Sequence, residues 1–159
     1  MEFFAIILKQ FWIACILVTF VNGIIFHFRS RKRVKENPEL TDGYRKIIKG
    51  FVLWGNIPWV VMGIGCTIGG IPSVFHFFNP KDVNPYVLAF FGSVVFIWAM
   101  GTYWLFLRGG AQMLVQHPGL LNYDIKSPTV VKLIWIACIL GGIAGVLVMY
   151  TQNIPLPKM

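Results

Sequence analysis

The chain has 159 residues, of which 57% are hydrophobic, 16% are aromatic and only 13% are charged. Soluble domains carry about 25% charged residues, so these proportions exclude a soluble enzyme core, a disordered chain and a secreted disulfide scaffold. The formal net charge is +8, and the cations that produce it are confined to a few short stretches.

Four long segments lack charged residues, and each is long enough to cross a bilayer. Uncharged runs of 19, 31, 25 and 25 residues follow Lys9, Lys49, Asp82 and Lys132, and a spanning helix needs about 20 residues. A helix satisfies its own backbone hydrogen bonds in hydrocarbon, and the runs lack the alternation of barrel strands. The sequence therefore predicts an all-α membrane protein forming a single transmembrane domain over residues 1–159, with spans near 6–28, 50–71, 85–107 and 133–151.

The basic residues predict how these spans are oriented. Eleven of the fourteen Lys and Arg residues fall in segments 29–49 and 108–132. Cytoplasmic loops carry an excess of Lys and Arg, so we expect four antiparallel helices in a bundle, with both termini on the non-cytoplasmic side of a plasma or inner membrane. Glu2 precedes the first span and the basic cluster follows it, the reverse of a cleavable signal peptide. The first span is therefore expected to be retained.

Turn residues lie in both long connections. Thr41 or Asp42 is expected to cap the helix that leads into the second span. The third helix is expected to continue past Arg108 until Pro118 and Gly119 end it.

Small residues mark the helix faces that can approach another helix closely in lipid. The fourth span has Ala137, Gly141 and Gly145 at four-residue spacing, and the second has Gly65 and Gly69. Each stripe either closes the bundle or joins it to other membrane subunits or to a second copy of the chain. We expect at least one of them to pack within the chain.

The histidines and cysteines do not form the pattern of a cofactor site. His27 and His76 lie at opposite ends of their spans, roughly a bilayer apart, and we interpret both, with His117, as interfacial residues. A haem shared with a partner subunit is the alternative. The cysteines lie inside the spans without CxxC spacing, as expected of small packing residues: Cys15, Cys66 and Cys138. We therefore expect no metal site and no cofactor, and we assign no catalytic residue.

A polar layer near the cytoplasmic boundary is one candidate ligand site. Asn22 and Asn56 each lie six residues inside a span, about 9 Å deep at 1.5 Å per residue. Pro58 cannot donate to the carbonyl of Trp54, which predicts a kink beside Asn56. The layer is either a cleft for an anionic headgroup or small acid, or a set of interhelical hydrogen bonds that pin the bundle. The cleft would be lined by Asn22, Trp54, Asn56, Thr102, Tyr103 and Arg108.

A dense run of cations follows the first span. It is expected to attract anionic lipid headgroups, at about 1 kcal/mol for each cation near the surface. Aromatic residues are not interleaved with these cations, so nucleic acid is not an expected partner. The run contains Arg29, Arg31, Lys32, Arg33 and Lys35.

In size, four spans, outward termini and a basic first cytoplasmic loop, the chain resembles the membrane-associated family of eicosanoid and glutathione metabolism, whose members are trimeric transferases and isomerases. Of the Arg, Asn, Glu and Pro that this family carries in its second span, only Pro58 is matched. Gly55 and Val52 stand at the Glu and Asn positions, so the glutathione-binding residues of that family do not transfer to this chain.

These features favour a multi-pass membrane protein without evident catalytic groups, acting as an accessory or assembly subunit or as a lipid-interacting module of a membrane complex. One alternative is a small membrane enzyme acting on a lipophilic substrate at the cytoplasmic interface, with Tyr103 or Arg108 polarising the reacting group. Another is an oligomeric transporter or channel with Asn22 and Asn56 lining its pathway.

The orientation is testable with fusions of alkaline phosphatase, which folds to an active enzyme only outside the cytoplasm. Because the cations of segments 29–49 and 108–132 should be held inside, a fusion at either terminus should be active. A fusion placed after Asn37 should be inactive. Inactive fusions at the termini would contradict the predicted orientation.

Overall fold

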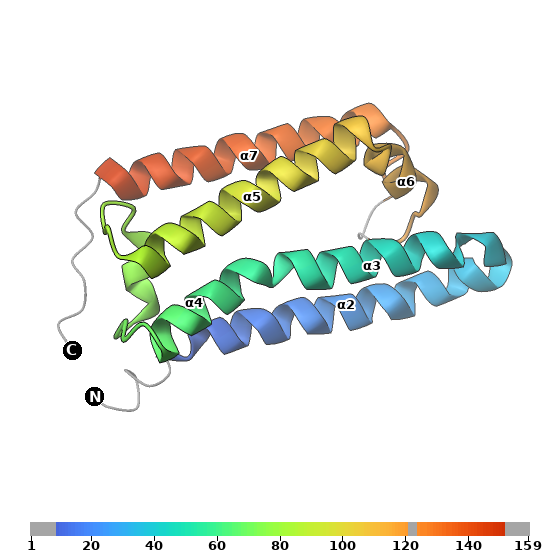
Figure 1. The fold of residues 1–159 in the computed structure, drawn as a ribbon. Coiled ribbons are helices and arrows are strands. Elements are labelled where there is room, and N and C mark those ends of the chain that lie inside the picture. The colour runs from blue at the N-terminus through green and yellow to red at the C-terminus, as the bar shows by residue number, and fades with distance from the viewer. Residues whose placement is uncertain (1–8, 121–123, 152–159) are drawn as a thin grey trace. The chain divides into compact units, whose positions relative to one another are not determined.

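The computed structural model describes residues 9–120 and 124–151, and all regular structure in these stretches is helical (Figure 1). Four helical segments are long and apolar enough to cross a membrane: α2, the stretch from η1 to α4, α5 and α7. This confirms the prediction of an all-helical chain with four helices of spanning length. The elements in order are α2 (Phe11–Glu36), η1 (Pro38–Leu40), α3 (Thr41–Gly55), α4 (Ile57–Thr67), η2 (Val74–Phe78), α5 (Pro85–Leu107), α6 (Gly110–Gln116) and α7 (Pro128–Thr151).

The helix bounds follow from local chemistry. Helix α2 continues through the basic run to Glu36, because Arg, Lys and Glu are good helix formers in water. Helix α7 begins at Pro128, a residue favoured in the first turn, where no intrahelical N–H bond is needed. The second span is interrupted at Asn56, two residues before Pro58, as expected from the donor that proline lacks.

The start of α3 differs from the sequence-based expectation, which had Thr41 or Asp42 as the cap. The capping side chain is Asn37, whose Oδ1 accepts a hydrogen bond of 3.2 Å from the Glu39 N–H at the start of η1. Helix η1 then runs directly into α3, so Thr41 already has helical dihedral angles. Its hydroxyl donates to the carbonyl of Pro38 at 2.6 Å.

Contacts divide the described chain into two compact units. The first unit comprises residues 9–18, 56–96 and 140–151. The second comprises residues 19–55, 97–120 and 124–139.

The core of the first unit lies between α4, η2 and the beginning of α5. Met62 and Cys66 of α4 are buried against Phe77 of η2 and against Val87 and Phe90 of α5. The rings of Phe77 and Phe90 meet edge to face, with centroids 5.6 Å apart. Burial of these large side chains provides the hydrophobic stabilisation of the unit.

Two glycines of the first unit allow this close packing. A Cβ atom at Gly65 would lie 2.6 Å from Phe77 Cζ and 3.0 Å from Tyr86 Cβ, and one at Gly69 would lie 2.5 Å from the Tyr86 ring. Gly70 has a left-handed φ of 66°, which lets the chain reverse so that the N–H of Ile71 donates to the carbonyl of Gly65 at 3.1 Å. The pair Gly65 and Gly69 therefore packs within the chain.

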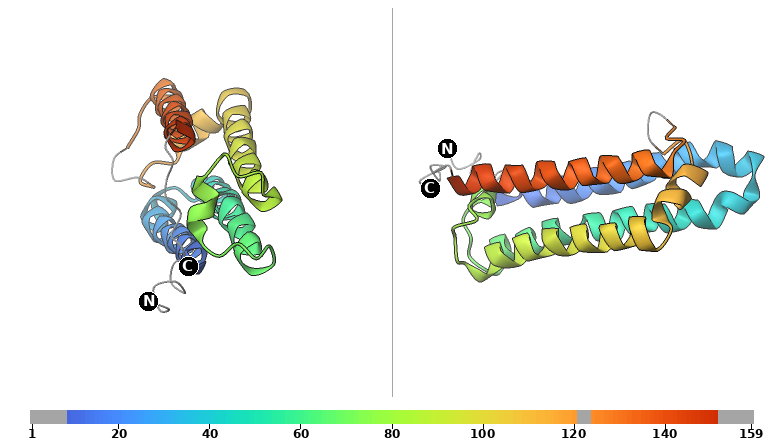
Figure 2. Two further views of the ribbon diagram at one scale, coloured as in Figure 1. Left: turned by 90° about the vertical axis from the view of Figure 1, so that its left-hand side faces the viewer. Right: turned by 90° about the horizontal axis from the view of Figure 1, so that it is seen from above.

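In the second unit, α2 and α3 form an antiparallel helical hairpin joined by η1 (Figure 2). The rings of Phe26 and Phe51 have centroids 5.0 Å apart. Gly23 lies against Val52, and Gly55 lies against Thr19. The contacting residues have increasing numbers in α3 and decreasing numbers in α2, which shows that the two helices run antiparallel.

The α5 and α7 segments of the second unit are joined by a side-chain hydrogen bond. The indole N–H of Trp135 donates to Thr102 Oγ1 at 2.9 Å, and that hydroxyl donates to the carbonyl of Trp98 at 2.7 Å. Gly101 allows this approach, since its Cβ would lie 2.5 Å from the Trp135 ring. Such bonds between helices stabilise packing in lipid, typically by about 0.6 kcal/mol.

The segment past Arg108 is helical and ends before Pro118, as expected, but it forms a separate helix, α6, and does not continue α5. Helix α5 ends at Leu107 and α6 begins at Gly110, because Gly109 adopts a left-handed φ of 72° that a helix cannot contain. Gly110 lies directly against the Trp104 ring, so α6 packs back toward the helix that precedes it. Leu114 of α6 contacts the buried cluster of this unit.

Alanine substitutions should change thermal stability in opposite directions at packed and at open glycines. Gly65→Ala should lower thermal stability, because overpacking costs about 1–3 kcal/mol, more than the roughly 1 kcal/mol by which Ala favours a helix over Gly. Gly92→Ala in α5 meets nothing within 4 Å and should be neutral or stabilising. Thermal unfolding of both variants in detergent measures the difference, and a shift of the same sign and size in both would contradict the packing at Gly65.

Candidate functional site

A groove of about 410 Å³ lies between α2 and α3 in the second unit. Its volume falls within the range of about 300–1,000 Å³ that is typical of ligand sites. Helix α2 contributes the cations Arg31 and Lys35, and α3 contributes Arg45 and Lys49. The other described lining residues are apolar or uncharged, and none is a carboxylate: His27, Ser30, Val34, Thr41, Tyr44, Ile48 and Val52.

Helical spacing explains why these residues line one groove. On α2 the lining positions 27, 30, 31, 34 and 35 recur every three or four residues, and so do positions 41, 44, 45, 48, 49 and 52 on α3. Residues at this spacing share one face of a helix. Each helix therefore presents a single stripe, with apolar side chains flanked by cations, and the hairpin brings the two stripes together.

The basic run of α2 is divided between two faces. Arg31 and Lys35 line the groove. Arg29 instead donates through Nη1 to the carbonyl of Leu120 at 3.1 Å, and Arg33 pairs through Nη2 with Asp124 Oδ2 at 3.4 Å. The five cations predicted to meet lipid headgroups therefore do not act as one uniform patch.

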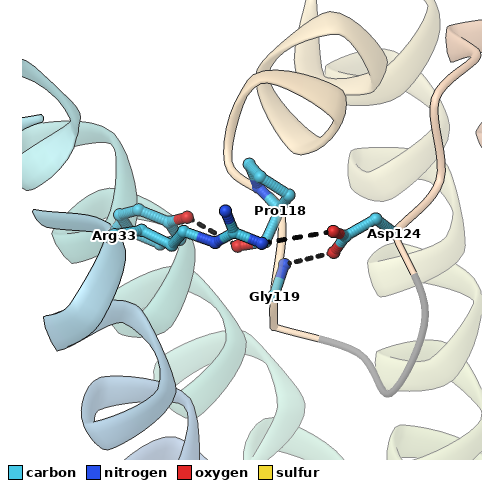
Figure 3. A network of polar contacts seen from close by, with 5 residues as sticks. Arg33, Pro118, Gly119 and Asp124 are labelled. Carbon is cyan, nitrogen blue, oxygen red and sulfur yellow. Dashed lines mark hydrogen bonds and ion pairs between the residues drawn. The ribbon is translucent and has the colours of Figure 1, made fainter. Parts of the chain in front are cut away.

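A network of polar contacts ties the hairpin to the segment after α6 (Figure 3). The Tyr44 hydroxyl donates to the carbonyl of Pro118 at 2.6 Å, and the N–H of Gly119 donates to Asp124 Oδ1 at 2.8 Å. Asp124 thus bridges Gly119 and Arg33. Tyr44 is only 2% exposed and also lines the groove, so one wall of the groove is anchored by this network.

His117, which the sequence analysis interprets as an interfacial residue, is buried within the protein. It is 8% exposed, its ring meets the Tyr44 ring edge to face at 4.9 Å, and its Nδ1 lies 2.7 Å from the carbonyl oxygen of Met113. A side chain at Gly43 would overlap the imidazole ring. His117 is therefore a buried packing residue of this network, and Gly43 is the residue that makes space for it.

The residues predicted to form the polar cleft are distributed over both units. The first unit contains Asn56. The second unit contains the other five residues: Asn22, Trp54, Thr102, Tyr103 and Arg108. Asn56 is 7% exposed and Tyr103 is 48% exposed, and the Thr102 hydroxyl is engaged by Trp135. A common cleft for these residues stays a prediction.

The histidines, cysteines and acids do not converge in the part of the chain that the structure covers. Within residues 9–120 and 124–151, no three of these side chains are placed to hold a metal ion together. His27 lines the groove and His76 lies in η2. Cys66 is buried in the core of the first unit, while Cys138 is exposed on α7.

Comparisons of this chain with protein-family models, with curated proteins and with solved structures find no match. Sequence reasoning singled out Arg31 and Lys35 but missed Arg45 and Lys49. The four-residue spacing of these two along an amphipathic helix was the signal that would have identified them.

Removal of the Tyr44 hydroxyl tests the network. Tyr44→Phe leaves the carbonyl of Pro118 without this donor and should destabilise the protein by about 1 kcal/mol, the usual net value of such a hydrogen bond. Limited proteolysis between α6 and α7 should also become faster. Tyr103→Phe, which alters an exposed tyrosine, is the matched control, and equal effects of the two would contradict the network.

Proposed function

We propose that this chain is an accessory or assembly subunit of a membrane complex. In this proposal the four spans form an antiparallel bundle in a plasma or inner membrane, both termini lie on the non-cytoplasmic side, and the basic connections meet the anionic cytoplasmic leaflet. Four apolar helices of spanning length support the membrane location. The concentration of cations in segments 29–49 and 108–132 supports the orientation.

The open glycine face of α7 carries the assembly role. None of the residues in the most apolar 18-residue window of α7 is buried, and a Cβ at Gly141 or Gly145 would meet nothing within 4 Å. By contrast, Tyr86 of the same chain occupies the space beside Gly65 and Gly69.

A lipid-facing helix gains nothing from small residues, whereas a helix that packs on another helix gains close backbone contact. Ala137, Gly141 and Gly145 lie four residues apart and therefore follow one side of α7. We infer that this stripe receives a helix of another subunit or of a second copy of the chain.

Leucine substitutions on this stripe test the proposal. Gly141→Leu combined with Gly145→Leu should prevent close approach of a partner helix and lower the fraction of chain found in larger complexes severalfold. The folded chain should persist, because both positions face open space within it. Native mass spectrometry of gently solubilised membranes measures the change.

The control is Gly92→Leu, which fills a similarly open position on α5 and should leave the complexes intact. A chain that is monomeric before substitution, or complexes that survive the α7 substitutions, would contradict the assembly role.

A further inference from the structure

The groove between α2 and α3 has an excess of positive charge that its own side chains do not neutralise. Among the described residues, its permanent cations are Arg31, Lys35, Arg45 and Lys49, and none of its lining residues is an acid. Within the described residues, salt bridges involve only Arg45 of these four, paired with Asp42 at 3.8 Å. Both partners of that pair are strongly exposed, so water screens the interaction and leaves Arg45 available.

The groove also changes character along its length. One end of the groove lies at the predicted membrane boundary. His27 lies there near the end of the first predicted span, at residue 28, and Val52 lies near the start of the second, at residue 50. Lys35 and Arg45 lie toward the η1 turn, outside those spans. Val34 and Ile48 line the groove between the cations. An occupant that matches this gradient is anionic at the turn end and apolar at the membrane end.

We propose that the groove binds one anionic phospholipid, with its phosphate among Arg31, Lys35, Arg45 and Lys49 and its first methylene groups along Ile48 and Val52. The proposal rests on the membrane orientation given under the proposed function. Arginine and lysine donate charge-assisted hydrogen bonds to phosphate oxygens, and the apolar lining favours a lipid over a free phosphate.

This site differs from general attraction of the basic run to a charged membrane surface. Surface attraction depends on the number of cations and not on the helix face they occupy. Lys32 and Lys46 lie on the same two helices as Lys35 and Lys49, three residues away in each case, but they do not line the groove. Two double variants that remove equal charge from the two helices therefore separate the models.

The test uses the full-length chain in detergent micelles, with lipid binding followed by native mass spectrometry. Dioleoyl phosphatidylglycerol should bind as one molecule per chain, more tightly than dioleoyl phosphatidylcholine. Lys35→Gln combined with Lys49→Gln should weaken phosphatidylglycerol binding about 25-fold, at about fivefold for each cation. Lys32→Gln combined with Lys46→Gln should change it by less than about threefold, because screened exposed charges act weakly at a distance.

Equal weakening in the two double variants would overturn the groove as the site. Phosphatidylcholine binding as tightly as phosphatidylglycerol would overturn the role of the cations. Glycerol 3-phosphate competing at the same concentration as the lipid would show that the apolar lining is unused, which would overturn the lipid as occupant.

A substitution that leaves charge unchanged gives an independent test. Ile48→Trp fills the groove and should reduce phosphatidylglycerol binding at least tenfold, while circular dichroism shows an unchanged helix content. If the Ile48→Trp variant does not fold, Val34→Phe on the opposite helix serves as the second groove-filling variant. Retained binding in a folded variant of either kind would overturn the proposal.

These outcomes are independent of the assembly role. A monomeric chain that binds phosphatidylglycerol selectively would contradict the assembly role alone. Complexes that require the α7 stripe but lack selective lipid binding would contradict the groove alone.

Discussion

Exclusion of charge from four long apolar segments is the constraint on which the rest of this structure depends. Charged groups are costly in hydrocarbon, so the cations are gathered in the connections, where eleven of fourteen lie in segments 29–49 and 108–132. Such crowding creates repulsion that the second unit must accommodate. Helix α2 does so by distributing its cations over two faces, one toward the segment after α6 and one toward α3.

The two faces are linked through Tyr44. Its ring lines the groove and contacts His117, while its hydroxyl donates to the carbonyl of Pro118. Arg33 and Asp124 extend this arrangement on the other side of α2. Because Tyr44 and His117 are both buried, the wall of the groove is held in position by packing as well as by hydrogen bonds. A site whose walls are held in this way loses little conformational entropy when a ligand binds.

The glycines of α7 have different surroundings from several glycines that precede it in the chain. Gly65 and Gly69 lie against Tyr86, and Gly101 lies against Trp135. At these positions the absence of a side chain lets an aromatic ring of the same chain pack closely. Gly141 and Gly145 of α7 have no such neighbour. Glycine therefore serves internal packing in α4, in the turn that follows it and in α5, whereas the open glycines of α7 are the basis of the proposed association with another helix.

That the chain has four helical segments long and apolar enough to cross a membrane was predictable from the sequence, since this depends on the local run of residues. The interruption before Pro58 was predictable for the same reason, because a missing backbone donor acts within one turn. The separate helix α6 was not predicted. The sequence did not predict which side of α2 each cation would face. Arg29 and Arg33 contact the segment after α6. Arg31 and Lys35 line the groove together with Arg45 and Lys49. Tertiary structure decided this division, together with the burial of His117, because the register between α2 and α3 and the position of the distant segment after α6 determine what each helix face meets.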